Sequence, residues 1–380
     1  MKHYHSLKLF LIHGLAAAIP LNGRLDVRHT TETAEGGIVD WIPIQSQVPN
    51  GNVASPPPLP IYNTMATFNT STPQPYDSEK GPEGTVPILR SARASVNKQP
   101  PPGIGSENDH VKRAVGDHWY ASSAQTVANH GGSASYSLFK AYTESGADFS
   151  LLQAAIIRTG VPKPGDNGQQ ITQTVEAGWI NYPNQVAAPH LFVFFTTNGY
   201  SAQGNNIGGW NRDVAGWVQT DNTIFPGVSF NPLSSRGGSQ YDLSIRWYLY
   251  QGNWWLSVLD RYIGYYPASL FGAGTDASRS LQQEASHINY YGEIYDSHPQ
   301  LTRTDMGSGN WPESGFGQSG YIRNMVYTDT SNVDRTYDGS RGIIISDANR
   351  YRMTASWNSG SNWGSYFYLG GPGAGGVIDG

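Results

Sequence analysis

The stretch Ile171-Thr-Gln-Thr-Val-Glu-Ala-Gly-Trp-Ile-Asn-Tyr-Pro183 has the alternation of a half-buried β-strand. One face of the expected strand is apolar and needs a hydrophobic core, and it carries Ile171, Val175 and Trp179. The opposite face is small and polar, and it carries Thr172, Thr174, Glu176 and Gly178. Because small neighbours leave space in front of a carboxylate, Glu176 is expected to face a cleft rather than a solvated wall.

A second stretch, Ile288-Asn-Tyr-Tyr-Gly-Glu-Ile-Tyr295, repeats this arrangement. Asn289, Tyr291, Glu293 and Tyr295 fall on one face of the expected strand, opposite Ile288, Gly292 and Ile294. Glu293 is therefore a second carboxylate on a polar strand face, here among aromatic rings and an amide. Two carboxylates in a shared cleft suit general acid/base chemistry, since one can hold a proton while the other stays ionised.

These two stretches resemble a known family. Glu176-Ala-Gly-Trp179 with the following Tyr182-Pro183, and Gly292-Glu-Ile294, resemble the two glutamate motifs of the neprosin family of secreted glutamic endopeptidases. Further stretches resemble the family in the same order along the chain: Gly238–Ile245, Gly252–Leu256, Gly264–Phe271, Met306–Gly309, Pro312–Phe316 and Tyr366–Gly373. The resemblance begins near His118 and runs to the C-terminus, and an ordered series is far more specific than one short motif.

The resemblance implies a curved β-sandwich with a catalytic dyad formed by Glu176 and Glu293. It also implies cleavage of peptide bonds in acid, often after proline, and an inhibitory N-terminal pro-region. In such a mechanism, which needs no metal or cofactor, one ionised glutamate takes a proton from water and the protonated glutamate donates to the peptide. Repulsion between close carboxyls would raise one pKa, which explains an acid optimum. The sequence leaves open which glutamate is the base.

Residues close to the dyad in sequence are candidates for binding the substrate. They are Tyr182, Asn289, Tyr291 and Tyr295. Aromatic grooves bind proline rings in other proteins, so these tyrosines suit a proline-containing peptide, although packing within the sheet would explain them equally well. Gln173 is expected to point away from Glu176 on an ideal strand, and Trp179 is expected in the core.

The composition supports an all-β fold. Charged residues make up 14% of the 380 residues, aromatic residues 12%, and there are 45 glycines, which suits many short strands and turns. An apolar run at Leu191–Thr196 predicts a strand buried on both faces, and Tyr241–Leu259 predicts a hairpin. Phe149–Ile157 is a strand by the resemblance but could be a short helix by pattern alone. We expect two packed antiparallel sheets.

Other classes of chemistry find little support. The chain has no cysteine, which excludes disulfides, cysteine catalysis and thiolate metal sites. The net charge of -5 and the lack of a basic cluster argue against a nucleic-acid partner. The ten histidines lack the spacing of a metal site, so we expect no metal and no cofactor.

The N-terminal sequence has the pattern of a secretory signal peptide. Residues 1–23 combine Lys2 and Lys8 with a short apolar run and a small-residue cleavage context at Ala16–Ala18, which predicts a signal peptide and a secreted protein. The run is too short to span a bilayer, and no later segment is long and apolar enough, so no membrane partner is expected.

Residues 24–113 differ in composition from the rest and are interrupted by proline clusters. We interpret them as a pro-region that lies across the cleft, the alternative being a disordered leader. Small ordered elements are expected near Gly37–Ile44 and Val86–Leu89. The dibasic pair Lys112-Arg113 is a candidate processing site, with self-processing in acid as the alternative, and Asn69 heads a glycosylation sequon.

The sequence thus predicts three parts: a signal peptide at 1–23, a pro-region at 24–113 and a catalytic domain at 114–380. The expected partners are polypeptide substrates rich in proline and the pro-region as an inhibitor, and we expect a monomer. Two alternatives remain at this stage. One is a two-glutamate glycoside hydrolase, and the other is a non-catalytic β-sandwich binding protein.

Overall fold

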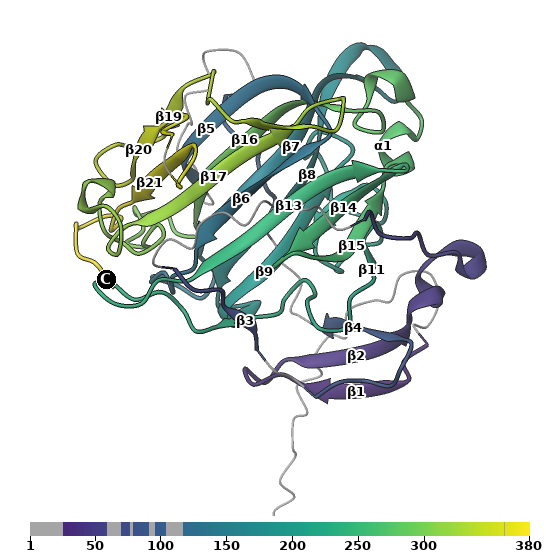
Figure 1. The fold of residues 1–380 in the computed structure, drawn as a ribbon, viewed down its shortest axis with the longest axis horizontal. Helices are drawn as coiled ribbons and strands as arrows, with labels where there is room; N and C mark the ends of the chain where they lie inside the picture. The colour runs from purple at the N-terminus through teal and green to yellow at the C-terminus, as the bar shows by residue number, and fades with distance from the viewer. Residues whose placement is uncertain (1–25, 59–69, 77–78, 91–95, 104–116, 361) are drawn as a thin grey trace, which may run out of the picture.

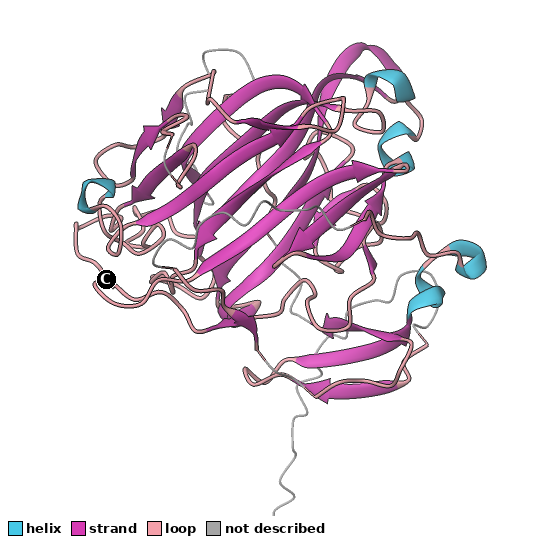
Figure 2. Cartoon of the chain, viewed as in Figure 1, coloured by secondary structure: helices cyan, strands magenta, loops and turns pink. Residues whose placement is uncertain are grey.

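The structure, a computed structural model, describes residues 26–58, 70–76, 79–90, 96–103, 117–360 and 362–380. The predicted signal peptide at 1–23, the sequon at Asn69 and the dibasic pair Lys112-Arg113 lie outside the described residues. Of the described residues, strands hold 48% and helices 5%, in antiparallel sheets none of which closes into a barrel, and this confirms the predicted all-β class (Figure 2).

The larger part of the fold contains two sheets (Figure 1). The first is a seven-stranded sheet, which in spatial order consists of β10 (Gly208–Trp210), β9 (Val186–Thr196), β8 (Asp166–Tyr182), β7 (Phe149–Lys163), β16 (Ala285–Asp296), β5 (Asp117–Asn129) and β19 (Ile343–Ile345). Phe149–Ile157 therefore belongs to a strand rather than a helix. The first glutamate stretch lies in β8 and the second in β16, so β7 alone separates them.

The second is a nine-stranded sheet. In spatial order it consists of β11 (Val218–Gln219), β15 (Arg261–Pro267), β14 (Asn253–Val258), β13 (Asp242–Tyr250), β6 (Gly131–Ser137), β17 (Gly320–Thr328), β21 (Tyr366–Gly370) and β20 (Arg352–Ser356), with β18 (Asp334–Thr336) paired to β17. The hairpin predicted at Tyr241–Leu259 is confirmed as β13 and β14. Gln251 and Gly252 form its turn and both have positive φ, which this type of tight turn requires.

One hydrophobic core fills the space between the two sheets. Val175, Ala177 and Trp179 of β8 belong to the same buried cluster as Trp247 of β13 and Leu256 of β14. Trp179 is fully buried, as predicted, and its indole N–H donates to the carbonyl of Ser137, 2.8 Å away. The alternation of β8 therefore points Glu176 to the outer face of the seven-stranded sheet, away from the core.

Helical structure is short in the described part of the chain. It comprises α1 (Ser269–Gly272) and the 3-10 turns η1 (Ile44–Gln47), η2 (Pro49–Gly51), η3 (Ala277–Arg279) and η4 (Pro312–Ser314). Among the described residues no helix has the length and apolar character needed to span a membrane.

The N-terminal residues form a small sheet of their own beside the sandwich, and its strands β1 and β2 are purple in Figure 1. It consists of β1 (His29–Glu32), β2 (Ile38–Pro43) and β4 (Thr85–Arg90), which includes both segments expected to be ordered. Trp41, Val39 and Val86 supply its buried side chains. A further pairing joins β3 (Gln74–Pro75) to β12 (Phe230–Asn231), and so ties this region to the sandwich.

The buried imidazole of His190 should make the fold less stable in acid. Burial lowers its pKa from 6.5 to about 4, although a hydrogen bond with the carbonyl of Ala188 partly opposes this. Since the unfolded chain then binds the proton more strongly, stability falls as pH drops from about 6.5 to about 4, by a contribution on the order of 3 kcal/mol. We expect His190→Leu to remove that pH dependence.

Urea unfolding at pH 7 and pH 4 measures this effect. His190→Leu should cost stability at pH 7, because it leaves the Gln185 amide and the Ala188 carbonyl without their partner. That cost should be smaller at pH 4. An equal cost at both pH values would contradict the assignment.

Candidate active site

The structure brings the two predicted glutamates together. Glu176 and Glu293 are both fully buried on the outer face of the seven-stranded sheet. The ammonium of Lys98 lies 2.9 Å from Oε2 of each carboxylate and forms an ion pair with both. The amide of Gln153, on the intervening strand β7, also lies between them, 3.1 Å from Oε2 of Glu176 and 3.4 Å from Oε2 of Glu293. Two carboxylates within reach of one ammonium form a dyad.

Two glycines of the glutamate motifs are required by close packing. A Cβ atom on Gly178 would lie 2.0 Å from the carbonyl oxygen of Leu152, so only glycine lets β7 and β8 pair at this point. A Cβ atom on Gly292 would lie 2.4 Å from Leu369 and 2.9 Å from the sulfur of Met306, both in the core. The two glycines thus allow the strands that carry the glutamates to take their places in the sandwich.

Apart from Lys98, the hydrogen-bond donors around Glu176 are neutral. Its Oε1 accepts from the hydroxyls of Tyr200 at 2.7 Å and Thr174 at 2.9 Å, and its Oε2 accepts from the hydroxyl of Tyr291 at 3.3 Å. Burial, and then the nearby carboxylates, raise the pKa of Tyr200 and Tyr291 well above 10, so both phenols keep their protons. Tyr200 has φ 62°, an uncommon value outside glycine, which is consistent with backbone strain at a functional site.

Glu293 has a different, charged environment. Nδ1 of His118, at the start of β5, lies 2.6 Å from Oε1 of Glu293, and His118 is itself buried. Burial would raise the pKa of Glu293, but the charges of Lys98 and His118 outweigh it, and the pKa lies below its ordinary value of 4.5. The two glutamates therefore differ in their partners, which suits different roles.

The lysine that joins the dyad comes from a distant N-terminal segment. Residues 96–103 cross the outer face of the seven-stranded sheet. At one end the carbonyl of Val96 accepts from the indole of Trp210 and the amide of Gln203, both at 2.9 Å. Towards the other end the carbonyl of Pro102 accepts from the amide of Asn289 at 3.0 Å. The segment is thus held at both ends with Lys98 inserted between the two glutamates.

Lys98 lies in an aromatic cage. Its ammonium is 5.4 to 5.9 Å from the ring centroids of Phe192, Phe194, Trp210 and Tyr291. Burial alone would lower the pKa of Lys98, but Glu176 and Glu293 outweigh it and raise the pKa above 10.5. The lysine therefore remains charged at every pH at which the dyad would work.

All four predicted substrate-binding residues lie on the outer face that carries the dyad. Tyr291 contacts Glu176, and Asn289 binds the carbonyl of Pro102. Tyr182 and Tyr295 contact the same apolar cluster as Val96 and Trp210. Gln173 was expected to point away from the dyad, and its amide binds the carbonyl of Phe271 instead.

Several residues of the site were not predicted from the sequence. They are Lys98, His118, Gln153, Tyr200, Gln203 and Trp210. Tyr200 and Gln203 lie in the loop between β9 and β10. Gln153 was the one with a usable signal, since a glutamine inside an apolar strand that pairs with the Glu176 strand must find buried partners.

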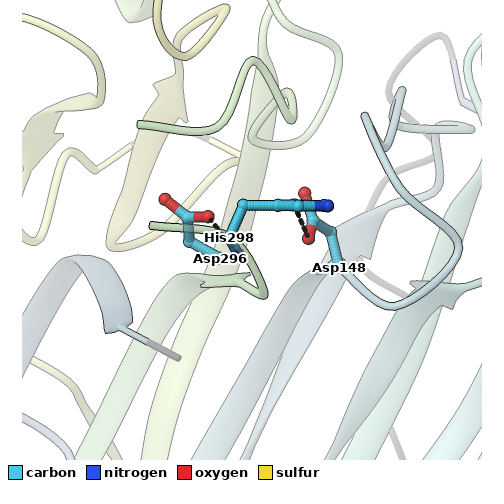
Figure 3. A group of neighbouring side chains, drawn as sticks. All are labelled: Asp148, Asp296 and His298. Carbon is cyan, nitrogen blue, oxygen red and sulfur yellow. Dashed lines mark hydrogen bonds and ion pairs between the residues drawn. The ribbon is translucent and has the colours of Figure 1, made fainter. Parts of the chain in front are cut away.

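A second acidic group lies at one end of the same sheet. Figure 3 shows Asp148, Asp296 and His298 side by side, with the imidazole of His298 pointing toward Asp148. The carboxylate of Asp148 accepts hydrogen bonds from the hydroxyls of Ser297, Thr302 and Thr304, at 2.5 to 2.8 Å. Asp296 accepts from the backbone amides of His298 and Thr302. These acids stabilise the turn after β16.

Comparison with known families agrees with this geometry. The sequence model of the neprosin family matches residues 146–372, more than half of the chain. The chain belongs to the neprosin family. The predicted family is thereby confirmed, and membership indicates a peptidase-type function.

The extent of the neprosin match separates two groups of site residues. Glu176, Glu293, Gln153 and Trp210 lie inside residues 146–372. Lys98 lies before that range, in the segment that covers the dyad. His118 also precedes it, although it belongs to β5 of the same sheet.

Proposed function

We propose that this protein is a secreted glutamic endopeptidase, made as a zymogen, that cleaves peptide bonds after proline in acid. The observation that carries the proposal is the pair of buried carboxylates, Glu176 and Glu293, on strands separated only by β7. Family membership favours a peptidase over a glycoside hydrolase or a binding module.

The reaction needs one ionised and one protonated glutamate. The ionised carboxylate removes a proton from water, whose oxygen attacks the carbonyl carbon of the peptide. The protonated glutamate donates to the carbonyl oxygen. The tetrahedral intermediate then collapses as the C–N bond breaks: the leaving nitrogen takes the proton that the base removed from water, and the intermediate returns a proton to the other glutamate. The phenols of Tyr200 and Tyr291, which keep their protons, can stabilise the charge on the carbonyl oxygen.

We assign Glu293 as the base and Glu176 as the acid. The hydroxyls around Glu176 can either donate or accept, so they suit a protonated as well as an ionised carboxyl. His118 in its charged form favours the ionised form of Glu293. His118 belongs to β5 of the sandwich and not to residues 96–103, so it stays beside Glu293 when that segment leaves. This difference in partners suits Glu293 as the base and Glu176 as the acid.

Preference for proline is supported by the aromatic cage around the ammonium of Lys98. Phe192, Phe194 and Trp210 present ring faces beside the dyad, which suits the flat, apolar ring of proline. Ser122 Oγ, Gln153 Oε1 and Asn289 Oδ1 are buried without a hydrogen-bond partner among the described residues, and these atoms are available to a peptide backbone.

The zymogen proposal is supported by residues 96–103, which cover the dyad. Val96 to Gly103 occupy the face that a substrate must reach, and Lys98 neutralises the dyad. Residues 24–113 thus act as the inhibitor of their own chain. The remaining parts of the proposal are a signal peptide at 1–23, processing near Lys112-Arg113 or by self-cleavage in acid, and a monomeric catalytic domain from 114.

Cleavage of a quenched peptide with a single proline tests the function. The purified full chain is first held in acid until it shortens, and the rate is then measured from about pH 2.5 to 7, with the cut mapped by mass spectrometry. A cut after proline in acid is expected. No cleavage after the N-terminal segment has been removed would refute the peptidase, and a cut elsewhere would refute only the proline preference.

The role of His118 leads to a separate prediction. His118→Asn keeps an N–H near the position of Nδ1 but removes the charge, so the pKa of Glu293 should rise and the acid limb of kcat/KM should move to higher pH by about one unit. The pH–rate profile of the acid-activated enzyme measures this. His298→Asn, an exposed histidine, is the matched control. A shift of the alkaline limb instead would reverse the roles of the two glutamates.

A further inference from the structure

An aromatic surface lies on the opposite side of the molecule from the dyad. Five rings on three neighbouring strands of the nine-stranded sheet form it: Tyr248 and Tyr250 on β13, Trp255 on β14, and Tyr262 and Tyr265 on β15. Trp255 and Tyr265 pack with centroids 4.6 Å apart, and Tyr248 and Tyr250 stack at 6.0 Å. Trp247 points from the same strand into the core, so this outer aromatic surface is the outward face of that sheet.

The chain covers this surface with its own residues 47–58. Val48, Val53 and Ala54 pack against the apolar cluster of Val218, Trp255 and Tyr265. The backbone N–H of Ala54 donates to the hydroxyl of Tyr265 at 3.1 Å. At the edge of the sheet, the side chain of Gln47 makes hydrogen bonds of 2.9 and 2.8 Å with the backbone N–H and carbonyl of Gln219.

Residues 47–58 end in three successive prolines, Pro56 to Pro58. Pro57 is buried, and Pro58 lines a hollow together with Tyr248, Tyr250 and Tyr262. Proline fixes φ near the polyproline II value and supplies no backbone N–H, so such a segment is recognised through its rings and carbonyl oxygens. Tyrosine suits this task, since its ring packs against proline and its hydroxyl donates to a carbonyl.

We propose that the outer aromatic surface is a second binding site, which holds proline-rich extended segments of the polypeptide substrate. The inference rests on the proposed function, because the surface is uncovered only when residues 47–58 leave with the pro-region. It goes beyond that function, since the site is distinct from the dyad and takes no part in the chemistry. A long substrate bound there has a higher effective concentration at the dyad than a short one.

Two substrates that share one cleavage site separate this binding from catalysis. The first is a peptide of about eight residues with one proline, and the second is a chain of about fifty residues that adds several Pro-Pro-Pro tracts. With the acid-activated enzyme, Tyr248→Ser/Tyr250→Ser should lower kcat/KM for the long chain about tenfold and leave the short peptide unchanged. Tyr366→Ser, a half-buried tyrosine on β21 of the same sheet, is the matched control.

A direct binding measurement keeps the proposal testable if the double variant does not fold. A labelled peptide of residues 47–58 should bind the activated wild-type enzyme and should bind the unprocessed chain at least tenfold more weakly. Equal binding to both forms, or an equal loss on both substrates, would overturn the proposal. So would mass spectrometry that finds residues 47–58 still attached after activation, since the surface would then only anchor the pro-region. If the activated enzyme does not cleave the short peptide, the proposed peptidase function is refuted. Binding of the labelled peptide would still show whether the outer aromatic surface is a binding site.

Discussion

Replacing Glu176 or Glu293 by glutamine should lower kcat for a proline-containing peptide by about 10³–10⁴-fold. Glutamine keeps the shape of the side chain but can neither hold the catalytic proton nor remove one from water. Because the reaction needs both steps, either substitution alone should be close to the effect of both together. KM should change little, since neither carboxylate is proposed to hold the substrate in its ground state.

The variants need a form of activation that does not depend on their own activity. A tagged wild-type enzyme can process them in trans and be withdrawn on its tag before the assay. Glu313→Gln, which changes an exposed glutamate, is the matched control and should keep full activity. If one glutamine variant kept more than about a tenth of the wild-type kcat, that glutamate would not belong to the dyad.

The alternation of the sequence was sufficient to predict the all-β class and the sheet face on which each of the two glutamates lies. Alternation along Ile171–Pro183 and Ile288–Tyr295 separates a core face from a polar face, and β8 and β16 keep that separation. The prediction works because the period of a strand is a local property that each segment carries by itself. The family motifs then paired the two strands, which no local pattern can do.

The partners of the dyad could not be predicted in the same way. Lys98 lies in a short run, Val96 to Pro100, with no period, and it is buried only because two carboxylates from distant strands neutralise it. His118 and Tyr200 reach the dyad from the start of β5 and from a loop. Such contacts depend on how separate elements pack, and a single sequence carries no record of that packing.

Under the proposed function, the buried charges predict a zymogen that is latent at neutral pH and active in acid. Pairing with Lys98 and His118 lowers the pKa of Glu293 below 4.5, so the stabilisation from that pairing is complete above pH 4.5 and is lost as the pH falls through the lowered pKa. The raised pKa of Lys98 has the opposite effect on the pH dependence of stability. The stabilisation from its charge is present at lower pH and is lost only in alkali above pH 10.5. In the proposed zymogen, acid should therefore weaken the hold on the segment by protonating Glu293 rather than by changing the lysine.

Lys98→Ala should consequently free the dyad at a pH at which the wild-type chain stays latent. Removing the cation leaves two buried carboxylates facing each other, and breaking a buried ion pair in this way costs about 3 kcal/mol or more. That cost corresponds to a rise of roughly 10²-fold in the fraction of molecules whose segment has left the dyad. We expect the variant to shorten itself faster and to begin at higher pH than the wild type, as followed by gel electrophoresis from pH 3 to 7.

Two further variants separate charge from packing at this position. Lys98→Met keeps a long apolar side chain among Phe192, Phe194 and Trp210 but removes the charge, so it should behave like Lys98→Ala if the ion pairs cause the latency. Lys80→Ala, an exposed lysine of the same N-terminal region, should leave the onset of processing unchanged. If Lys98→Met stayed as latent as the wild type, the hydrogen bonds to the carbonyls of Val96 and Pro102 would be enough to hold the segment. The ion pairs of Lys98 would then not control activation.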